Sequence, residues 1–483
     1  MKKRAQVPDA HTYTILFRGL AENASYPLAL AKALSIYHSM DAANSPVRPN
    51  PIHTNAVLKV CARAADMDAM FGITAKLGRK GLRAPNNLTF TTVLNAVRQD
   101  AIKSITNGES NEAALNKAIM NSRLMWDDIV TRWRQGDLRI DEELVCSMGR
   151  ILLLGKKVDV DDIFSLIEQT MQVPRIFPRL SIPEQEKIDS YLEKEKDMAI
   201  SAAVDCRTKD LSRRYEFRAV IPCDSTSGSL SAYAKPGPNT ISLVLEALFK
   251  LRIRQPLREY WDIFTKHYGV QPDGQNFHSY LRNLRLFRAS KETLEMLQQM
   301  PSLFFAKKTF RIAMSSCLRD KNNVNSFSHA GKILDLMEEK LPETDLPALQ
   351  SYLEVAVISA VPKNHLLPEG QLKESKYSPQ GAQIKQALNR LNPYFINIKS
   401  TLADERNLLM KDVVEANEYR ESAIALARDM IGAHDKLINN GMADKECHGV
   451  LIRGRKDLAA FVTEYNHKYI HPKGREVSLK ATR

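Results

Sequence analysis

The sequence predicts an all-α fold: a solenoid of stacked helical hairpins, followed by a separate set of helices at the C-terminus. Three observations lead to this fold class. A Pro-Asn/Asp turn recurs along the chain, two amphipathic stretches follow each turn, and 44% of the 483 residues are hydrophobic. That fraction is enough for a sizeable core, and a repeat protein grows by adding hairpins rather than by enlarging one core.

The recurring turn is a proline beside an aspartate or asparagine, just before an apolar helical pattern. It occurs as Pro8-Asp9, Pro49-Asn50, Pro85-Asn86, Pro238-Asn239 and Pro272-Asp273. The Pro-to-Pro spacings are 41 and 36 in the first block and 34 in the second, and Ile140-Asp141 is a version without proline. Proline fixes φ, and the short acid or amide caps the next helix, so each turn marks a new hairpin.

Between the turns, apolar residues recur at spacings of three and four, which is typical of amphipathic helices. In the second repeat the expected apolar face comprises Ala56, Val57, Val60 and Cys61 on the first helix and Met67, Met70, Phe71, Ile73, Thr74 and Leu77 on the second. Gly81 then ends the helix. One hairpin cannot bury such a face alone, so neighbouring hairpins are expected to stack.

Seven to eight repeats are expected, and the pattern divides the chain into five parts. They are N-terminal repeats over 8–171, an irregular insertion over 172–237, a second block of repeats over 238–360, a linker over 361–378 and a C-terminal helical annex over 379–483. Within the insertion, 185–197 has the pattern of a charged helix. The annex lacks the turn, and its helices are expected over 382–391, 403–439 and 456–469. We expect it to bind protein, either its own solenoid or a neighbour.

Charge and cysteine content restrict the function classes. The net charge of +13 suits an anionic partner, nucleic acid or a membrane surface. The six cysteines lie far apart without a CxxC pair, which indicates buried thiols in a reducing compartment rather than a zinc site or a disulfide scaffold. No run of 18 apolar residues predicts a membrane span. The basic start, Met1 to Arg4, precedes no apolar signal core, so no presequence is evident.

Several patterns come near a catalytic or metal-binding motif without forming one. The stretch 149–157 has its glycines six apart and no Ser/Thr after the lysine, so it does not match a phosphate loop. His467 and His471 lack the glutamate of a zinc motif and precede a proline. The acids Asp159, Asp161 and Asp162 suit a helix N-terminus better than a metal. The sequence therefore predicts no catalytic residues, no metal, no cofactor and no small-molecule substrate.

Cationic residues concentrate in two repeat blocks. Residues 1–100 hold 13 Lys/Arg against 6 Asp/Glu, and residues 250–320 also hold 13 against 6. The candidates for phosphate contacts are Arg252, Arg254, Arg258, Arg282, Arg285, Arg288, Lys307, Lys308 and Arg311. Phosphate contacts of this kind are independent of base sequence and sensitive to salt. A solvated helix face is the alternative interpretation of any one of these residues.

The repeats resemble the pentatricopeptide repeat family rather than the tetratricopeptide repeats, whose Trp-x2-Leu-Gly signature is absent. The matching helix starts are Thr12-Tyr13-Thr14, Thr89-Phe90-Thr91 and Asn276-Phe277-His278, and the matching ends run from Gly81 to Pro85-Asn86 and from Gly269 to Pro272-Asp273. The resemblance covers about 8–100 and 238–320, and more loosely 113–171 and 321–360. It implies a right-handed superhelix.

The resemblance also implies which residues face RNA, because each repeat of this family reads one base with its fifth and its last residue. The base-reading candidates are Thr14 with Asn50, Asn55 with Asn86, and Thr91 with Asp141; the base-sandwiching candidates are Ile52 and Leu88. The family code then suggests A, a pyrimidine and G, read 5′ to 3′. Cys146 and Val244, at the same place in later repeats, do not fit that code.

Family resemblance therefore implies non-catalytic binding of single-stranded mitochondrial RNA, either rRNA or mRNA. The overall layout resembles fungal mitochondrial members that act in small-subunit rRNA maturation and ribosome assembly, which adds ribosomal small-subunit proteins as expected partners. Two alternatives remain open at this stage. One is a stable mitochondrial ribosome component or translation activator, and the other is a protein-only helical scaffold.

Overall fold

The structure is a computed structural model, and it describes residues 8–23, 27–42, 45–81, 83–106, 111–180, 217, 233–361, 377–403 and 413–467. Over these ranges the chain is helical, and its one β-type pairing is an isolated bridge between Tyr377 and Ala443. Two compact units divide the chain, Met1–Pro272 and Asp273–Arg483. The prediction of an all-α solenoid of hairpins is confirmed.

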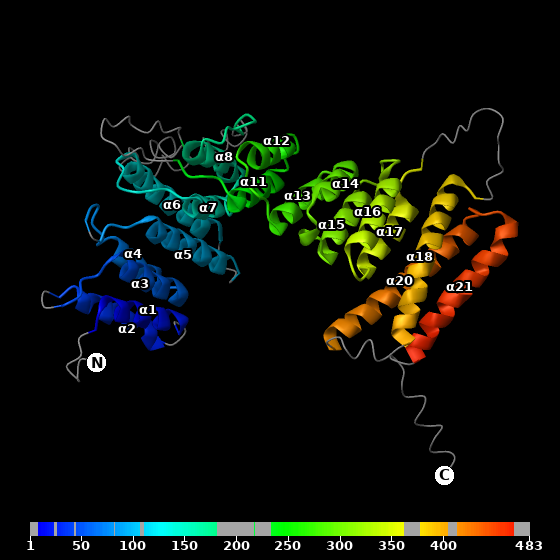
Figure 1. Ribbon diagram of the computed structural model, residues 1–483, viewed down its shortest axis with the longest axis horizontal. Coiled ribbons are helices and arrows are strands. Elements are labelled where there is room, and N and C mark those ends of the chain that lie inside the picture. Colours follow the sequence, from blue (N-terminus) through cyan, green and yellow to red (C-terminus); the bar gives the residue numbers. More distant parts are fainter. Residues whose placement is uncertain are drawn as a thin grey trace, which may run out of the picture. The chain divides into compact units, whose positions relative to one another are not determined.

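The first unit is a series of helical hairpins (Figure 1). Its helices are α1 (Ala10–Glu22), α2 (Pro27–Met40), α3 (Pro51–Ala64), α4 (Met67–Thr74), α5 (Asn87–Thr106), α6 (Asn111–Arg134), α7 (Glu142–Leu152), α8 (Lys157–Met171), α11 (Pro238–Leu251), α12 (Leu257–Asp262) and the π-helix η2 (Ile263–His267). The first helices of successive hairpins, α1, α3, α5, α7 and α11, pack side by side. They form one layer, and the second helices pack against it.

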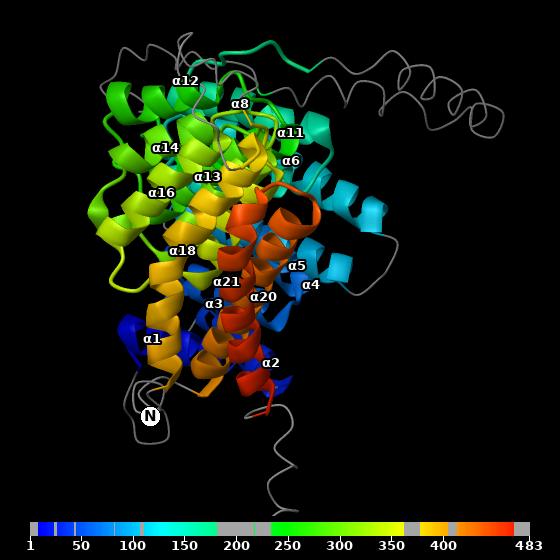
Figure 2. The same cartoon turned by 90° about the vertical axis from the view of Figure 1, so that its right-hand side faces the viewer.

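The second unit continues the hairpin pattern and ends in the annex. Its helices are α13 (Gly274–Leu286), α14 (Ser290–Gln299), the short 3-10 helix η3 (Ser302–Phe304), α15 (Lys307–Arg319), α16 (Ser326–Lys340), α17 (Leu346–Ile358), α18 (Pro379–Ala403), α20 (Val413–Asn439) and α21 (Lys445–Tyr465). The helices α13, α15 and α17 form the layer of first helices. The annex helices α18, α20 and α21 run beside one another (Figure 2), and α18 and α20 also pack on α17.

The Pro-Asn/Asp turns act as the sequence indicates, by capping helices. The side chains of Asp9, Asn50 and Asp273 each accept a hydrogen bond from the backbone N–H three residues later. The turn at Pro238-Asn239 differs from the others. Pro238 is already the first residue of α11, and the capping residue before it, Gly237, has no side chain that could bind the helix start. Glu142 of α7 supplies the missing acceptor, 2.8 Å from the backbone nitrogen of Thr240.

Two of the annex helices, α18 and α21, are longer than the sequence pattern indicates. α18 continues through Pro393, because Leu391, Phe395 and Ile398 on either side are buried and hold the helix against its neighbours. α21 begins at Lys445 rather than near 456, since its first turns bury Leu451. The end of α20 is as expected, with Gly441 at a positive φ of 63° directly after it. Residues 404–412 of the expected helix over 403–439 and the expected helix over 185–197 lie outside the described residues.

Candidate nucleic-acid interface

A line of polar side chains joins the starts of neighbouring first helices, and we call it the polar seam. Its pairs are His53–Ala10, Thr89–Asn55, Asn87–Asp141 and Glu142–Thr240 in the first unit, and His278–Thr309 and Arg311–Asp345 in the second. The donor–acceptor distances lie between 2.5 and 2.8 Å. Helix starts carry free N–H groups, so short polar residues collect there, and within each unit the seam links neighbouring first helices.

Asn55 lies inside the seam and is 4% exposed. Its Nδ2 donates to Oδ1 of Asn86, 3.2 Å away, and its Oδ1 accepts from the hydroxyl of Thr89 at 2.7 Å. Asn86 also accepts from the backbone N–H of Thr89 and thereby caps α5. The structure therefore brings together the two residues predicted to read the base of the second repeat. It also engages both of their amides in joining α3 to α5.

The other two predicted base-reading pairs are not joined by hydrogen bonds, although all four residues are described. The buried Thr14 donates to the carbonyl of Ala10 in its own helix, whereas Asn50 caps α3. Thr91 is 6% exposed. Asp141 caps α7 and accepts from the side chain of Asn87. Among the predicted base readers, Asn86 is the one whose side chain is exposed.

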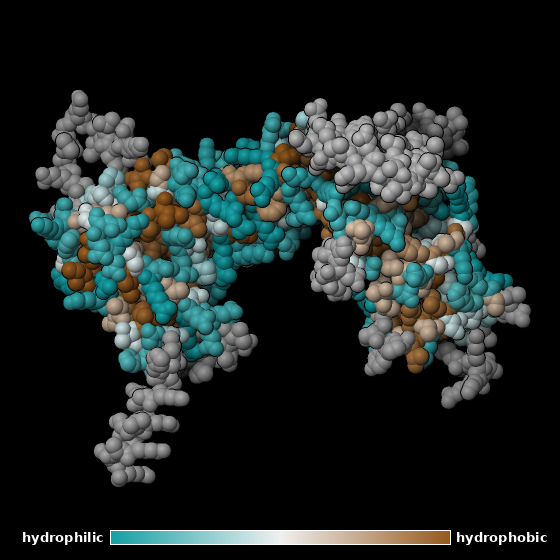
Figure 3. Space-filling model, turned by 180° about the vertical axis from the view of Figure 1, so that it is seen from behind, coloured by the Kyte–Doolittle hydropathy of each residue, from teal (hydrophilic) through white to brown (hydrophobic). Residues whose placement is uncertain are grey.

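The two predicted base-sandwiching residues do reach the surface. Ile52 is 60% exposed in the first turn of α3, and Leu88 is 47% exposed in the first turn of α5. Apolar residues are visible on the surface of the N-terminal hairpins (Figure 3). Because α3 and α5 are neighbours in one layer, these side chains occupy equivalent places on adjacent helices. An exposed apolar side chain at each helix start is suited to contact with the face of a base.

Three of the predicted phosphate contacts lie in the first unit and are exposed: Arg252, Arg254 and Arg258. Arg252 ends α11 with a positive φ of 57°, and its N–H binds the carbonyl of Leu248. Arg258 lies on α12. These guanidinium groups follow a single helix end, so they form a local concentration of positive charge.

Two of the predicted phosphate contacts in the second unit are already neutralised by carboxylates. Arg311 donates two hydrogen bonds to Asp345, at 2.8 and 2.7 Å, and Asp345 also caps α17. Lys307 lies 3.2 Å from a carboxylate oxygen of Glu343. Phosphate contact by Arg311 would break a bidentate ion pair that also belongs to the polar seam, so Arg311 serves primarily to join α15 and α17.

The remaining cations of this region form an uncompensated cluster on two adjacent helices, which we call the arginine cluster. Arg282 and Arg285 lie on α13, and Arg319 lies on the neighbouring α15. The Nε atom of Arg285 is buried without a hydrogen-bond partner. Burial, together with the charges of Arg319 and Arg282, lowers the pKa of the Arg285 guanidinium. No described carboxylate pairs with these three residues, so the cluster lacks a counter-ion.

Lys308 and Arg288 extend this positive region. Lys308 is exposed at the start of α15, and its charge, after the larger effect of burial, lowers the pKa of His278 on α13. Arg288 is exposed just beyond α13, with a positive φ of 57°. Guanidinium groups with unused donors in a fixed arrangement suit an anion with several acceptor oxygens, such as a phosphodiester.

Sequence reasoning missed Arg319 as a member of this cluster. A signal was present, because Arg319 follows Arg285 by 34 residues, which equals the spacing of the turns in this block. Residues one period apart occupy equivalent places on neighbouring first helices. His278 was also missed as a part of the polar seam, and its place in the repeat is that of the fifth residue.

Polar groups elsewhere that resemble catalytic sites are structural. Ser290 is fully buried and donates its hydroxyl to Asp320 at 2.6 Å, while Nδ1 of His329 lies 2.9 Å from the same hydroxyl oxygen. Since the serine proton points to the carboxylate, His329 must donate to the serine, opposite to the direction needed for a base. This network ties α14 to α15 and α16.

The acids that precede the apolar stretch of α8 bind arginines. Asp159 and Asp162 both accept from Arg123, at 2.7 and 2.8 Å, and the buried Asp161 accepts from Arg175 at 2.5 Å. Over the described residues, no group of three or more His, Cys, Asp or Glu side chains could hold a metal ion. Likewise, none of the described helices is long and apolar enough to cross a membrane.

The described cysteines are unpaired, and Cys61, Cys146 and Cys317 are buried. Burial raises the pKa of each of these three thiols to about 12, so they remain protonated at neutral pH. Cys447 is half-buried. Cys206, Cys223 and His471 lie outside the described residues.

Comparison with known proteins gives one curated relative and several solved structures. No family model matches the sequence. The relative, from Schizosaccharomyces pombe, is described as "Pentatricopeptide repeat-containing protein 2, mitochondrial"; it is 22% identical over 349 residues, 70% of this chain and 67% of its own length. Two crystal structures of the pentatricopeptide repeat protein PPR10 with an 18-nt psaJ RNA element are 13% identical, with a TM-score of 0.27. The match covers 94% of this chain and 61% of PPR10.

Helical hairpins stacked in one layer of first helices, with polar and cationic helix starts, define a helical-repeat solenoid protein. The turn at each repeat and the aromatic-polar helix starts resemble those of pentatricopeptide repeats, and the fission-yeast relative is described by that name. The chain is thus similar to pentatricopeptide repeat proteins.

Proposed function

We propose that this protein binds single-stranded RNA through its first helices and that it does so without catalysis. The observation that carries the proposal is the arginine cluster, in which three guanidinium groups on adjacent helices lack a described counter-ion. An anion bound to such a cluster relieves the repulsion among its like charges. A phosphodiester backbone supplies such an anion at every nucleotide, and the overall charge of +13 favours the approach of one.

Base contact is proposed for the N-terminal hairpins. The exposed side chains of Ile52 and Leu88 offer apolar surface on adjacent helices, and the exposed amide of Asn86 lies at the start of the helix that carries Leu88. Bases lie unstacked in single strands, so their faces can pack on such residues while their edges bond to amides. This part of the proposal follows the reading mode implied by the family resemblance.

The finer role that we propose is in mitochondria, in the maturation and stability of RNA, with small-subunit rRNA processing and ribosome assembly as the specific step. The fission-yeast relative carries the word mitochondrial in its description, which supports the compartment. The role in rRNA processing is supported by the layout of degenerate repeats followed by a helical annex. Density-gradient profiles of the native protein, with and without RNase, separate the role in rRNA processing from the two alternatives. A stable ribosome component would sediment with the mature particle. The profile of a protein-only scaffold would not change on RNase treatment.

The direct test of RNA binding is charge reversal in the arginine cluster. Arg282→Glu with Arg319→Glu should weaken binding to any single strand by at least about tenfold and reduce the slope of log K against log salt by about 1 to 2. The matched control is Lys291→Glu with Lys332→Glu, two exposed cations on the second helices α14 and α16. Fluorescence anisotropy with labelled RNA measures both. Equal affinity of the two double variants would reject the proposed phosphate path.

A further inference from the structure

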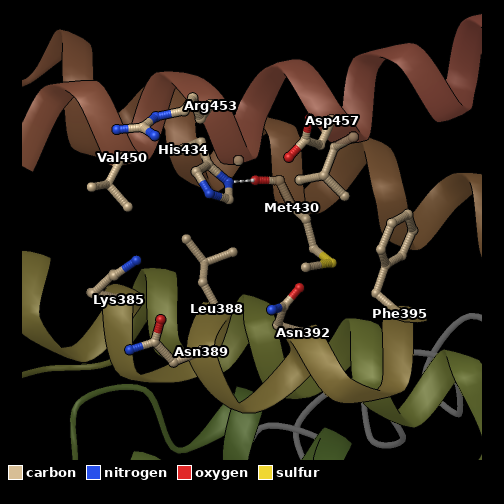
Figure 4. A pocket seen from close by; sticks show the side chains of 12 residues that line it. Lys385, Leu388, Asn389, Asn392, Phe395, Met430, His434, Val450, Arg453 and Asp457 are labelled. Carbon is tan, nitrogen blue, oxygen red and sulfur yellow. Dashed lines mark hydrogen bonds between the residues drawn. The ribbon is translucent and has the colours of Figure 1, made fainter. Parts of the chain in front are cut away.

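The annex contains a cavity of about 510 Å³ that is lined by α18, α20 and α21 (Figure 4). We call it the annex groove. Its polar lining comprises Lys385, Asn389 and Asn392 of α18, His434 of α20, and Arg453 and Asp457 of α21. α18 and α21 each pack on α20, which leaves the groove between them. Its volume falls within the range of about 300–1,000 Å³ that is usual for ligand pockets.

Most apolar residues of the groove are already covered, although Val450 is 56% exposed. Leu388, Met430 and Leu458 are 3%, 3% and 4% exposed. A helix laid into a groove gains affinity by burying exposed apolar side chains, and these three have almost no area left to bury. The groove therefore offers mainly hydrogen bonds and charge, which favours a polar ligand over an apolar helix.

Most polar side chains of the groove lack partners among the described residues. Lys385, Asn389, Asn392 and Asp457 make no side-chain hydrogen bond or ion pair with any described residue, and Arg453 bonds only to a carbonyl of its own helix. Several charges next to the groove are paired: Arg455 binds Asp435, Arg390 binds Asp335, and Lys436 donates to the carbonyl of Val357. Donors and acceptors are thus available together in the groove.

His434 adds a hydrogen-bond acceptor, its Nε2 atom, to the lining of the groove. Its Nδ1 donates to the carbonyl of Met430 at 2.8 Å, so Nε2 carries the lone pair of the neutral ring. The side chain is 7% exposed, and burial is the largest cause that lowers its pKa, ahead of the charge of Lys385. Gly454 lets α21 approach this ring, because a Cβ atom there would lie 3.0 Å from Nε2.

The polar groups are distributed unevenly along the groove. Lys385 and Arg453 lie toward one end, and Asn392, Asp457 and Phe395 toward the other (Figure 4). Two cations at one end suit a phosphate. An amide and a carboxylate at the other end suit the edge of a heterocyclic base, since the carboxylate accepts from amino and imino groups.

We propose that the annex groove binds one nucleotide, with its phosphate at Lys385 and Arg453 and its base at Asn392 and Asp457. The same chemistry is offered by a free 5′-mononucleotide and by an unpaired nucleotide of RNA, and the second source rests on the proposed function. The annex then has a ligand of its own in addition to its packing on α17.

The test is calorimetric titration of the full chain with AMP, GMP, CMP and UMP, with inorganic phosphate and free nucleosides as separate arms. Lys385→Gln and Asn392→Ala should each weaken the preferred mononucleotide about tenfold or more. Two control variants should leave its affinity unchanged. Asn397→Ala changes an exposed asparagine on α18, and Lys456→Gln an exposed lysine on α21, both outside the groove. Asn392, Asn397 and Lys456 are exposed and Lys385 is half-buried, and thermal unfolding checks that each variant folds.

Competition then identifies the source of the nucleotide. If single-stranded RNA displaces the mononucleotide, the groove holds part of the RNA; if both bind at once, the ligand is a free nucleotide. Either result supports the nucleotide site. Failure of all four mononucleotides to bind up to about 10 mM, or equal binding of phosphate alone, overturns it. Loss of mononucleotide affinity in the control variants as well overturns it too. The dependence of RNA affinity on Arg282 and Arg319 is measured in a separate experiment. The proposed RNA binding can therefore be confirmed or rejected independently of the nucleotide site.

Discussion

The side-chain amide of Asn55 on α3 donates to the side-chain oxygen of Asn86 at the start of α5, 3.2 Å away. The two residues are 31 positions apart in the sequence, close to one repeat. Both are of the type that pentatricopeptide repeats use to contact a base, and in this chain they hold neighbouring hairpins together. Base reading, if these residues perform it as proposed, would compete with stability for the same two amides.

Asn55→Ala should destabilise the first unit. The change removes two hydrogen bonds of the 4% exposed Asn55, one accepted from the hydroxyl of Thr89 and one donated to the side chain of Asn86, at a cost of about 1–3 kcal/mol. Chemical unfolding of the full chain, monitored by circular dichroism, measures this cost. Asn397→Ala on α18 is the control, since that side chain is exposed and makes no side-chain hydrogen bond with the described residues. An unchanged unfolding midpoint for Asn55→Ala would assign the amide to base reading alone.

Ile52→Ala and Leu88→Ala should weaken RNA binding without changing stability. Both side chains are exposed, so their removal leaves no cavity, but a base packed against either would lose apolar contact. A loss of about 1 kcal/mol corresponds to a roughly fivefold weaker affinity. Leu28→Ala on α2 is the control, as it removes an equally exposed apolar side chain from a second helix. If all three variants bind RNA with the same affinity as the unaltered protein, bases do not contact the starts of α3 and α5.

The sequence predicted the hairpins because their signals are local. Proline and a capping acid or amide fix where each first helix begins, as Asp9 and Asp273 do. Longer-range contacts escaped prediction for the same reason. Nothing within a few residues of Arg311 indicates that Asp345, 34 positions later, neutralises it. The polar seam and the arginine cluster both depend on the packing of helices from different repeats.

The annex was predicted less well, because its helices lack the turn. Their bounds are set by packing against α17 and against each other, so the apolar pattern alone misplaced the start of α21. The annex groove was not expected at all. Its polar residues come from three helices, and Lys385 and Arg453 are far apart in the sequence.

Arg175→Ala should be strongly destabilising. Arg175 donates to Asp161, which is 1% exposed, and its guanidinium lies over the ring of Phe177 at 4.8 Å from the centroid. Removing one partner of a buried ion pair leaves an unpaired charge, at a cost of about 3–5 kcal/mol. The apparent unfolding midpoint in urea measures the effect.

Arg179→Ala is the comparison for that variant. Arg179 is 42% exposed, and its partner Asp162 keeps a second arginine, Arg123. We expect its loss to cost no more than about 1 kcal/mol. Similar midpoints for Arg175→Ala and Arg179→Ala would contradict the assignment of the Arg175 pair as a buried support of α8.

The second unit should lose stability as the pH falls below 6.5. Burial lowers the pKa of His278, His329 and His434 from the ordinary value of 6.5, so the unfolded chain binds protons more readily than the folded one. The neutral rings contribute their full stabilisation above pH 6.5. This stabilisation declines as the pH falls from 6.5 toward the lower pKa values of the histidines in the folded chain. His434→Gln keeps a polar side chain without titration, so its unfolding midpoint should depend less on pH between 6.5 and 5. Identical pH profiles of this variant and the unaltered protein would show that His434 does not contribute.

Removal of the annex should destabilise the solenoid that it covers. α18 and α20 pack on α17, whose residues Leu349, Tyr352 and Leu353 are at most 2% exposed. A chain ending at residue 361 would expose that face to water, at a cost of several kcal/mol by the usual value of about 25 cal/mol per Å². We expect a lower unfolding midpoint for the truncated chain and concentration-dependent association through α17. Analytical ultracentrifugation measures this association. A truncated chain that is monomeric and as stable as the full protein would mean that the annex does not support the solenoid.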